Sequence, residues 1–538
     1  MLSLKTWQEQ RDEFEKAGVE LPSFDVKAAK EAGAAQPRWI HFGAGNLFRT
    51  FHAEVAQRLL DQGLMDRGVV VADIRHADTV ESVWRPFNDD VLEVVMRPDG
   101  KLDKRVIASV AASLFAHPSC PADYEQMKRY FESPELQLVT VTITEKGYGL
   151  TDASGKLLPA VTEEMAAGPE APKTSMGIVA ALLHARFVAG AAPIAMVTTD
   201  NFSQNGRRFR ESVTTIARGW LEAGKVDAAF VDYVSDEGRV SFPWSMIDRI
   251  TPNPSEDVRA KLADEGFGDI DLIATPGGTT FASFANTEEA HYLVIEDSFP
   301  AGRPALDKGG VILTDRATAE KADTMKVTAC LNPLHTCLAV YGCLLGYTRI
   351  WQEMEDEDLV ALIRHLGYDE DLPVVVDPKV IDPQAFIAEL LEKRLPNKAL
   401  PDAPQRIASD TSQKVPIRYG HTLAAYAADP ALDPAKLTYI PLVIAGWLRY
   451  LLGVDDKGEQ FTPSPDPLLS ELQGQLAGIS LGCADERAVH AAVAPILSNK
   501  EIFTVDLYEL GLGEKVEKML LSELVGPGAV RATIRSYN

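Results

Sequence analysis

The stretch RWIHFGAGNLFRTFHAEVAQRLLDQG, residues 38–63, predicts a strand, a tight glycine turn and a helix in succession. Its first residues form the short apolar run that is typical of a buried strand. The turn falls at GAG, residues 43–45, and Gly63 supplies a helix stop. Between them, apolar side chains recur at the spacing of a helix face, at Phe48, Phe51, Val55 and Leu59. Because GVVVADIR, residues 68–75, predicts a second buried strand, the chain opens with a β-α-β unit.

The same alternation of strands and helices continues along the N-terminal part. LQLVTVTITE, residues 136–145, alternates polar and apolar side chains, as a strand does. APIAMVTTDN, residues 192–201, predicts another strand, and the apolar helix pattern GIVAALLHARFVAG, residues 177–190, precedes it. Strands that alternate with helices imply a parallel, doubly wound sheet, so we expect an α/β domain here.

The sequence changes character beyond residue 300. Helix patterns dominate and strand-like alternation is almost absent, as in LVALIRHLG (359–367), FIAELLEKRL (386–395), YIPLVIAGWLRYLL (439–452) and VEKMLLSELV (516–525). DSFPAGRPALDKGG, residues 297–310, is rich in Pro and Gly and is the natural hinge. We therefore expect two domains, a dinucleotide-binding domain over 1–297 and a mainly α-helical substrate-binding and catalytic domain over 298–538.

Composition limits the kinds of partner. Of the 538 residues 46% are hydrophobic and 24% charged, as in soluble globular proteins. Lys and Arg total 53 against 78 Asp and Glu, and the formal charge of −25 gives no basic surface for nucleic acid. An anionic substrate would need a local basic pocket.

Nothing in the sequence predicts export or membrane insertion. The N-terminus has charges in its first turns and lacks a signal-peptide pattern, which predicts a cytoplasmic location. The longest apolar stretches are short or interrupted by Arg449, so we expect buried helices and no membrane anchor. Five cysteines without a CxxC pair fit reduced thiols.

GAGNLF supplies part of a dinucleotide-binding fingerprint. Gly43 and Gly45 would let the backbone turn and approach a pyrophosphate at a helix N-terminus, with Asn46 and Arg49 in the first turn as further contacts. Phe48 replaces the third glycine, and a bare turn is the alternative. Asp73 ends the second strand, where a carboxylate would bind the ribose and favour NAD over NADP, although it lies further on than the usual ~20 residues.

Polar residues follow two of the later strands. Glu145 and Lys146 end one strand pattern, and Asp200 and Asn201 end the next. Ligands in open α/β sheets gather at these carboxyl ends, so all four are candidate site residues. The alternative for Asp200 and Asn201 is an Asx turn or a helix cap.

MKVTACLNPLH, residues 325–335, carries the candidate reacting groups. Oxidising a secondary alcohol needs a base for the hydroxyl proton, and burial lowers the pKa of an ammonium group toward neutrality. Lys326 could be that base, with the amides of Asn332 and Asn201 steadying the reacting oxygen. The alternative is an apolar core helix from which Lys326 reaches solvent and in which His335 is a core histidine.

A zinc site is the rival chemistry, since Cys330, His335 and Cys337 lie close in sequence. Seven residues of helix would separate the two cysteines by ~10.5 Å, too far for one ion whose ligands lie ~2.3 Å away. We therefore expect no metal.

Six motifs resemble the mannitol dehydrogenase family, the long-chain polyol and uronate dehydrogenases. They occur in the family's order, as GAGNLFR, TITEKGY, TTDN, FPWSMIDRITP, VIEDSFPAGRP and MKVTACLNPLH. The resemblance implies a zinc-independent NAD enzyme with a Rossmann-type N-terminal domain, a helical C-terminal domain and an active site in the cleft between them. It also implies a function for individual positions.

By this resemblance Lys326 is the general acid/base, Asn201 and Asn332 are the amides that hold the reacting oxygen, and His335 contacts substrate. Asp323 stands where the family has a proton-relaying glutamate. RIASDTSQKVP resembles a segment with two substrate-binding basic residues eight apart, here Arg406 and Lys414.

One departure concerns the lysine. The family usually places it five residues before the asparagine, whereas six separate Lys326 from Asn332 and the five-back position holds Val327. On a regular helix Lys326 and His335 would point ~180° apart. An extra residue is commonly absorbed as a π-bulge, and Pro333 removes one helical hydrogen bond, so we predict a bulge or kink between Lys326 and Asn332.

Within the family, CLNPLHT and YGCLLGY resemble most the fructuronate reductase branch, which implies D-fructuronate and D-mannonate as the substrate pair. Tagaturonate and altronate, or a neutral polyol such as mannitol or arabinitol, are the alternative substrates. A sensor or scaffold that binds NAD without catalysis is a second hypothesis, favoured by the altered lysine spacing. The sequence does not reveal the oligomeric state.

Overall fold

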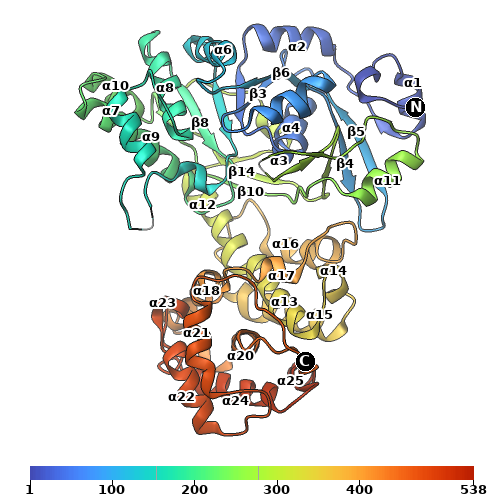
Figure 1. Cartoon of the computed structure of the whole chain (residues 1–538), viewed down its shortest axis with the longest axis vertical. Helices are drawn as coiled ribbons and strands as arrows, with labels where there is room; N and C mark the ends of the chain where they lie inside the picture. The colour runs from blue at the N-terminus through green and yellow to red at the C-terminus, as the bar shows by residue number, and fades with distance from the viewer. Residues whose placement is uncertain (153, 277) are drawn as a thin grey trace. The chain divides into compact units, whose positions relative to one another are not determined.

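The computed structural model describes residues 1–152, 154–276 and 278–538, and the chain divides into two compact units (Figure 1). The N-terminal unit comprises residues 1–97 and 101–320, and the C-terminal unit comprises residues 98–100 and 321–538. Each unit has its own architecture and is described by itself.

A six-stranded parallel sheet forms the centre of the N-terminal unit. Its strands are β2 (Trp39–Phe42), β3 (Val69–Asp73), β6 (Val110–Phe115), β7 (Leu138–Val141), β8 (Ile194–Thr198) and β9 (Val240–Ser241). They lie in the order β6-β3-β2-β7-β8-β9, which is third, second, first, fourth, fifth and sixth along the chain. This is the order of a Rossmann fold, so the predicted doubly wound sheet is confirmed. The order reverses between β2 and β7, the position at which such sheets bind ligands.

Helices cover both faces of this sheet because successive strand residues point to opposite sides. Ile40 and Phe42 of β2 belong to a core shared with α6 (Pro121–Glu132), α8 (Ser175–Val188) and α9 (Asn205–Glu222). Trp39 belongs to the opposite core, with α3 (Asn46–Thr50) and α4 (His52–Asp61). The single helix predicted after the glycine turn is thus two helices, because the backbone breaks at Phe51, where φ is −118° and ψ is −75°.

Smaller sheets complete the N-terminal unit. A mixed four-stranded sheet runs in the order β1 (Val19–Glu20), β5 (Leu102–Ile107), β4 (Val91–Met96), β13 (Phe284–Thr287). A three-stranded sheet joins β10 (Ser245–Asp248), β14 (Tyr292–Glu296) and β15 (Ile312–Thr314), and β11 (Ile273–Ala274) pairs with β12 (Thr280–Phe281). The remaining helices are α1 (Arg11–Lys16), α2 (Val26–Ala35), α5 (Ala77–Thr79), α7 (Pro159–Ala167), α10 (Ala228–Ser235) and α11 (Glu256–Asp264).

The Pro- and Gly-rich segment 297–310 is part of the N-terminal unit and not a hinge. Leu306 and Val311 are buried in the core that includes α4, and β15 pairs in parallel with β14. Arg316 makes ion pairs with Glu237 and Glu296. The boundary therefore falls between Glu320 and Lys321 rather than between 297 and 298, because buried apolar contacts and strand pairing extend past the turn residues.

The C-terminal unit is helical, and no strand occurs among its described residues, which confirms the prediction for the second half. Its longer helices, shown in Figure 1, are α13 (Asn332–Leu345), α15 (Glu357–His365), α16 (Pro383–Glu389), α19 (His421–Ala428), α20 (Tyr439–Leu451), α22 (Glu486–Leu497), α24 (Gly513–Leu524) and α25 (Ala529–Tyr537). Shorter ones are α14 (Ile350–Glu353), α17 (Pro404–Ile407), α18 (Thr411–Val415), α21 (Leu469–Gln475) and α23 (Lys500–Phe503). The helix α12 (Arg316–Met325) leads into this unit.

Four π turns interrupt these helices, at Lys326–Cys330, Leu366–Asp371, Leu390–Arg394 and Pro416–Gly420. The first packs against the second and the fourth. Its position confirms the bulge predicted between Lys326 and Asn332.

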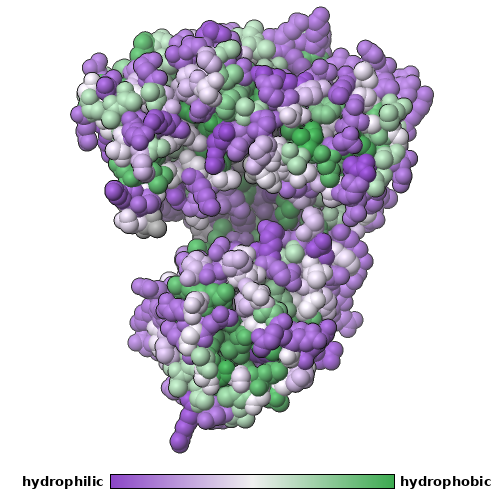
Figure 2. All heavy atoms as spheres, viewed as in Figure 1, coloured by the Kyte–Doolittle hydropathy of each residue, from purple (hydrophilic) through white to green (hydrophobic). Residues whose placement is uncertain are grey.

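The exterior is mainly hydrophilic on the face in view (Figure 2), as the charge of −25 would require. Large exposed apolar side chains, such as Leu64, Val188 and Val525, stand far apart in sequence. Within the described chain, the helical stretch Arg316–Leu345 is long and apolar enough to cross a membrane, but 72% of its apolar window is buried inside the protein, as in a core helix.

A buried acid provides a test of the C-terminal core. Glu523 is fully buried on α24, and its Oε1 accepts a hydrogen bond of 3.0 Å from the hydroxyl of Tyr341. Burial raises the pKa of Glu523 to about 8. The folded protein therefore holds this proton up to about pH 8, whereas an unfolded glutamate releases it near pH ~4.3.

We expect Glu523→Gln to flatten the pH dependence of stability. The contribution of Glu523 is fully present below the unfolded pKa and is lost as the pH rises through the folded pKa, with a slope of about 1.4 kcal/mol per pH unit. Urea unfolding between pH 5 and 8 would measure the free energy of unfolding at each pH. Glu471→Gln, a substitution of an exposed glutamate, is the control. Parallel profiles for wild type and Glu523→Gln would contradict a neutral Glu523.

Candidate functional site

The two glycines of the GAG turn have different tasks. Gly43 has φ of 119°, and a Cβ there would lie well inside van der Waals contact of the carbonyl oxygen of Thr142 at the end of β7. Gly45 has φ of −82°, and a Cβ there would meet no atom within 4 Å. Gly43 thus lets β2 and β7 approach each other, while Gly45 leaves open space beside the turn.

That space belongs to a cavity of about 210 Å³ at the point where the strand order reverses. Gly43, Gly45, Asp73, Thr142 and Thr144 are among its lining residues. A bare Cα facing a cavity at this point of a Rossmann sheet allows the close backbone approach that a pyrophosphate needs. The residues present therefore fit a dinucleotide.

Asp73 lies at the end of β3 on the same cavity. Its Oδ1 accepts hydrogen bonds of 2.8 Å from the backbone amides of Arg75 and His76, which fixes the carboxylate. Burial raises the pKa of Asp73, against the effect of these hydrogen bonds. The position agrees with the predicted ribose contact, which remains a prediction.

Arg49 has a different task from the predicted phosphate contact. It is fully buried, and its guanidinium donates to the carbonyl oxygens of Ala282 at 2.6 Å and Phe284 at 3.4 Å, and to Oδ1 of Asn46 at 3.1 Å. Asn46 is buried as well and donates to the carbonyl oxygen of Thr280 at 3.4 Å. Both side chains fasten α3 to residues 280–284, so the prediction for Arg49 is wrong and Asn46 would contact a cofactor only through its backbone.

Asp200 is engaged within the protein. Its Oδ2 accepts from the amide of Ile143 at 2.9 Å and from the hydroxyl of Tyr148 at 2.7 Å, and its Oδ1 accepts from the amide of Thr144 at 2.8 Å. Thr144 has φ of 65°, so these bonds hold a strained turn after β7 against the end of β8. Both oxygens therefore accept hydrogen bonds within the protein, and the predicted part of Asp200 in a ligand site stays a prediction.

The other residues at these strand ends are exposed. Glu145 forms an ion pair of 2.6 Å with Arg208, which ties it to α9. Lys146 is exposed in the turn after β7, and Asn201 is exposed after the end of β8. The roles expected for these three residues remain predictions.

The C-terminal unit arranges the opening of α13. Lys326 starts the π turn, its carbonyl accepts from the amide of Leu331 at 3.1 Å, and the residue is only 2% exposed. Asp323 is buried one turn earlier, and α13 begins at Asn332. The alternative in which Lys326 extends into solvent from an unbroken helix is therefore wrong.

Side chains of the segment 416–428 hold both sides of this break. Pro333 has no amide hydrogen, so the helix cannot continue its hydrogen bonds through it. The hydroxyl of Tyr419 donates to the carbonyl of Pro333 at 2.8 Å. The hydroxyl of Thr422 lies 3.5 Å from the carbonyl oxygen of Thr328 and 3.2 Å from Oδ1 of Asp371. Burial raises the pKa of Asp371, so a neutral Asp371 can donate to Thr422 while Thr422 donates to Thr328.

His335 lies against a carboxylate that the sequence did not reveal. Its Nε2 is 3.0 Å from Oδ2 of Asp402. Nε of Arg406 donates to Oδ1 of the same Asp402 at 3.1 Å. Burial raises the pKa of Asp402, but the contacts with His335 and Arg406 outweigh it and lower the pKa to about 2. Arg406 is otherwise exposed, so Asp402 neutralises the first of the two predicted substrate-binding cations.

Lys414 is half-buried on α18. Its Nζ donates to the carbonyl oxygens of Ile407 at 3.0 Å and of Ser409. Burial, reinforced by the charge of Arg418, lowers the pKa of Lys414 to about 8. Its predicted role in substrate binding stays a prediction.

The candidate zinc ligands are dispersed. Cys330 and Cys337 are buried free thiols whose pKa is raised by burial, and His335 faces Asp402. Among the described residues, no group of three His, Cys, Asp or Glu side chains is placed to hold an ion.

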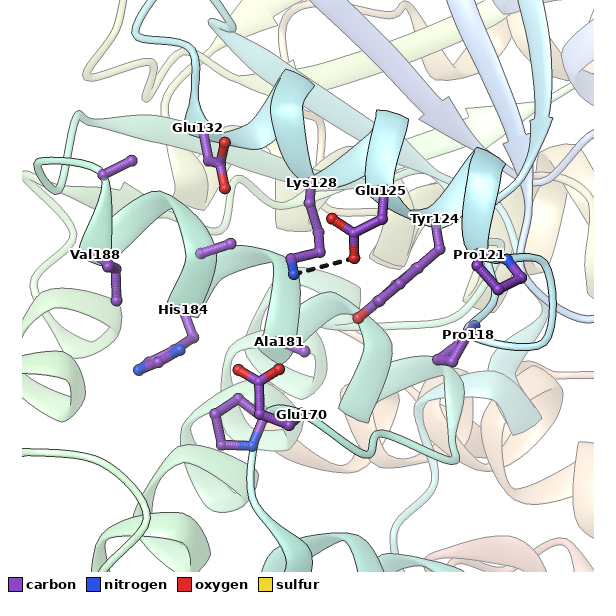
Figure 3. Close-up of a pocket in the computed structure, with 13 residues that line it drawn as sticks. Pro118, Pro121, Tyr124, Glu125, Lys128, Glu132, Glu170, Ala181, His184 and Val188 are labelled. Carbon is purple, nitrogen blue, oxygen red and sulfur yellow. Dashed lines mark hydrogen bonds and ion pairs between the residues drawn. The ribbon is translucent and has the colours of Figure 1, made fainter.

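Another hollow, of about 420 Å³, lies between α6 and α8 in the N-terminal unit (Figure 3). Figure 3 shows Lys128 turned toward Glu125 of the same helix, with Tyr124 next to them and His184 on α8. The Nζ of Lys128 lies 3.3 Å from Oε1 of Glu125. None of the predicted site residues lines it.

Comparisons with known proteins agree with this architecture. Residues 37–308 match the model of the mannitol dehydrogenase Rossmann domain, and residues 320–521 match that of the mannitol dehydrogenase C-terminal domain. A D-mannonate oxidoreductase of Thermotoga maritima is 49% identical over 97% of this chain and 96% of its own length. A polyol:NADP oxidoreductase of Gluconobacter oxydans is 29% identical over 86% of this chain and 88% of its own length.

Solved structures are similar over nearly the whole chain. The crystal structure of a D-sorbitol dehydrogenase in substrate-free form superposes with a TM-score of 0.78 at 25% identity, covering 96% of this chain and 98% of that one. Pseudomonas fluorescens mannitol 2-dehydrogenase, solved with NAD and D-mannitol, gives 0.69 at 26% identity and 96% of both chains. The resemblance found in the sequence motifs is thereby confirmed. This chain belongs to the mannitol dehydrogenase family and is an oxidoreductase.

Proposed function

We propose that this protein is an NAD-dependent oxidoreductase that interconverts D-fructuronate and D-mannonate. The observation that carries the proposal is the 49% identity, over 97% of the chain, to the D-mannonate oxidoreductase of Thermotoga maritima. The same proposal places the protein in the cytoplasm, acting on a small molecule without a nucleic-acid or membrane partner. Its five cysteines, all free thiols, support that location.

The cavity at the end of β2 and β3 is the proposed NAD site. The backbone of residues 43–46 would approach the pyrophosphate, and Asp73 would accept hydrogen bonds from the ribose hydroxyls. A carboxylate at this position repels a 2′-phosphate, which favours NAD over NADP. When bound, NAD supplies the hydride acceptor for alcohol oxidation.

The proposed acid/base is Lys326. Its burial at the start of the π turn keeps the ammonium group out of bulk water, and its amine form would take the proton of the substrate hydroxyl. The amides of Asn332 and Asn201 would donate to the oxygen as negative charge develops on it. Asp323, one turn before Lys326, would pass the proton on to water.

His335 is the proposed substrate contact on α13. The carboxylate of Asp402, 3.0 Å from Nε2, would orient the ring and leave Nδ1 to a substrate hydroxyl. Asp402 is a positioning residue in this arrangement, because it acts through His335.

A panel of substrates tests the proposal. Oxidation of NADH or NADPH would be followed with D-fructuronate, D-tagaturonate and D-fructose. We expect the highest kcat/KM with NADH and D-fructuronate, and D-mannonate as the product. A preference for tagaturonate or fructose would overturn the substrate, and NADH binding without turnover of any of them would support the non-catalytic alternative.

A further inference from the structure

Arg418 is a cation with few partners in an acidic protein. It is only partly exposed, in the π turn Pro416–Gly420, and its single hydrogen bond goes from Nη1 to Oγ1 of Thr336. No carboxylate of the described chain lies within ion-pair distance. Three fully buried arginines also lack a carboxylate, but each donates to at least three oxygens, namely Arg49, Arg186 and Arg449. Arg418 thus has N–H donors that no acceptor among the described residues uses.

The one partner of Arg418 connects it to the candidate reacting residues. Thr336 lies four residues after Asn332 on α13, and its hydroxyl donates to the carbonyl oxygen of Asn332 at 2.8 Å. Four helical residues rise by ~6 Å, which is comparable to the length of an open-chain sugar derivative from its reacting carbon to its far end. Through Thr336, Arg418 is therefore attached to the first turn of α13, which carries Asn332 and His335. Its attachment point lies about one substrate length from Asn332 along the helix axis.

Arg418 lies near a second cation, Lys414, and no carboxylate raises the pKa of Arg418. Lys414 precedes it by four residues, so the two side chains lie on adjacent turns of one helical face. Burial lowers the pKa of Arg418 to about 10, as expected for a cation without a countercharge. Asp410 and Asp466 raise the pKa of Lys414 but do not touch Arg418. Arg406 is already paired with Asp402. Of the three basic side chains between 406 and 418, only Arg406 forms an ion pair, and Arg418 is the one whose pKa no carboxylate raises.

We propose that Arg418 binds the far carboxylate of a sugar-acid substrate and sets the preference for sugar acids over neutral polyols. The proposal deepens the proposed function and rests on it. The planar guanidinium can donate two parallel hydrogen bonds to a carboxylate, which a hydroxymethyl group cannot match. A carboxylate would also relieve the repulsion between Arg418 and Lys414.

Binding measurements on the whole enzyme with NADH test the proposal. Calorimetry would compare the affinity for D-mannonate and D-mannitol in wild type, Arg418→Met, Arg418→Lys and the control Arg487→Met, an exposed arginine of the same unit. We expect Arg418→Met to lose about 10- to 100-fold in affinity for mannonate and less than about threefold for mannitol. Arg418→Lys keeps the positive charge but lacks the two parallel N–H donors of a guanidinium group, so an intermediate loss of mannonate affinity is expected. Arg487→Met should match wild type.

Equal weakening of mannonate and mannitol would overturn the proposal, because Arg418 would then act only through Thr336 as a structural tie. Unchanged mannonate affinity would overturn it as well. Arg418→Lys, which retains size and charge, decides the question if Arg418→Met does not fold. The proposed function can fail while this proposal holds. In that case the wild type would turn over another sugar acid faster than fructuronate, and Arg418→Met would still lose affinity for sugar acids but not for mannitol.

Discussion

Replacing Lys326 by alanine is expected to lower kcat for ketose reduction by about 10²- to 10⁴-fold, the usual contribution of a positioned acid or base. The affinity for NADH should change by less than about twofold, because the cavity beside Gly45 and Asp73 contains no atom of Lys326. Alanine has no proton to give, and its methyl group leaves the backbone of the π turn free to keep its hydrogen bond from Leu331.

The control is Lys321→Ala, which removes the same charge from the exposed side of α12. Steady-state kinetics and quenching of protein fluorescence by NADH would separate turnover from cofactor binding. Lys326→Arg should be nearly as inactive as alanine, since a guanidinium group does not lose its proton near neutral pH. If Lys326→Ala keeps the wild-type kcat, Lys326 has no part in the reaction.

The glycine turn should give two opposite phenotypes. Gly43→Ala would place a Cβ against the carbonyl oxygen of Thr142 at φ of 119°, so strain and overlap act together and the free energy of unfolding should fall by several kcal/mol. Gly45→Ala has φ of −82° and open space, so its folding should be unchanged. Its methyl group would instead stand in the cavity and weaken NADH binding by about tenfold or more.

Thermal unfolding and NADH titration of both variants would measure this difference. Gly45→Ala acts as the matched control for Gly43→Ala, since the two differ by two residues in sequence and add the same group. Full NADH affinity in Gly45→Ala would show that the dinucleotide does not approach this side of the turn. Wild-type stability in Gly43→Ala would mean that β2 and β7 can separate at no cost.

The parts of the fold that repeat along the chain were predictable from sequence. β2, β3, β7 and β8 lie where apolar runs predicted them, and the helical second half follows from its periodicity. The hairpin of β4 and β5 was not predicted, because its residues do not alternate between apolar and polar and the charged Glu93 and Lys104 are buried in it. The domain boundary was missed because Pro and Gly mark turns, and turns also occur inside a packed unit.

Site residues were predictable where the motif is local in sequence. The predictions failed where the interacting partner is distant in sequence. The bulge followed from counting residues between Lys326 and Asn332. Arg49 was misassigned, since two of its acceptors, the carbonyl oxygens of Ala282 and Phe284, lie more than 230 residues away in the chain. Asp402 and Arg418 carried no local signal at all, because what distinguishes them is which residues of α13 they meet.

The π turns bear on how this unit can evolve. A turn closed by a hydrogen bond five residues back contains one more residue than an α-turn. An insertion at such a place therefore lengthens the helix by one residue without rotating the segments on either side out of their packing. The C-terminal unit has four such turns. We therefore expect single-residue insertions and deletions at these turns to move one side chain around the helix while its neighbours stay in place.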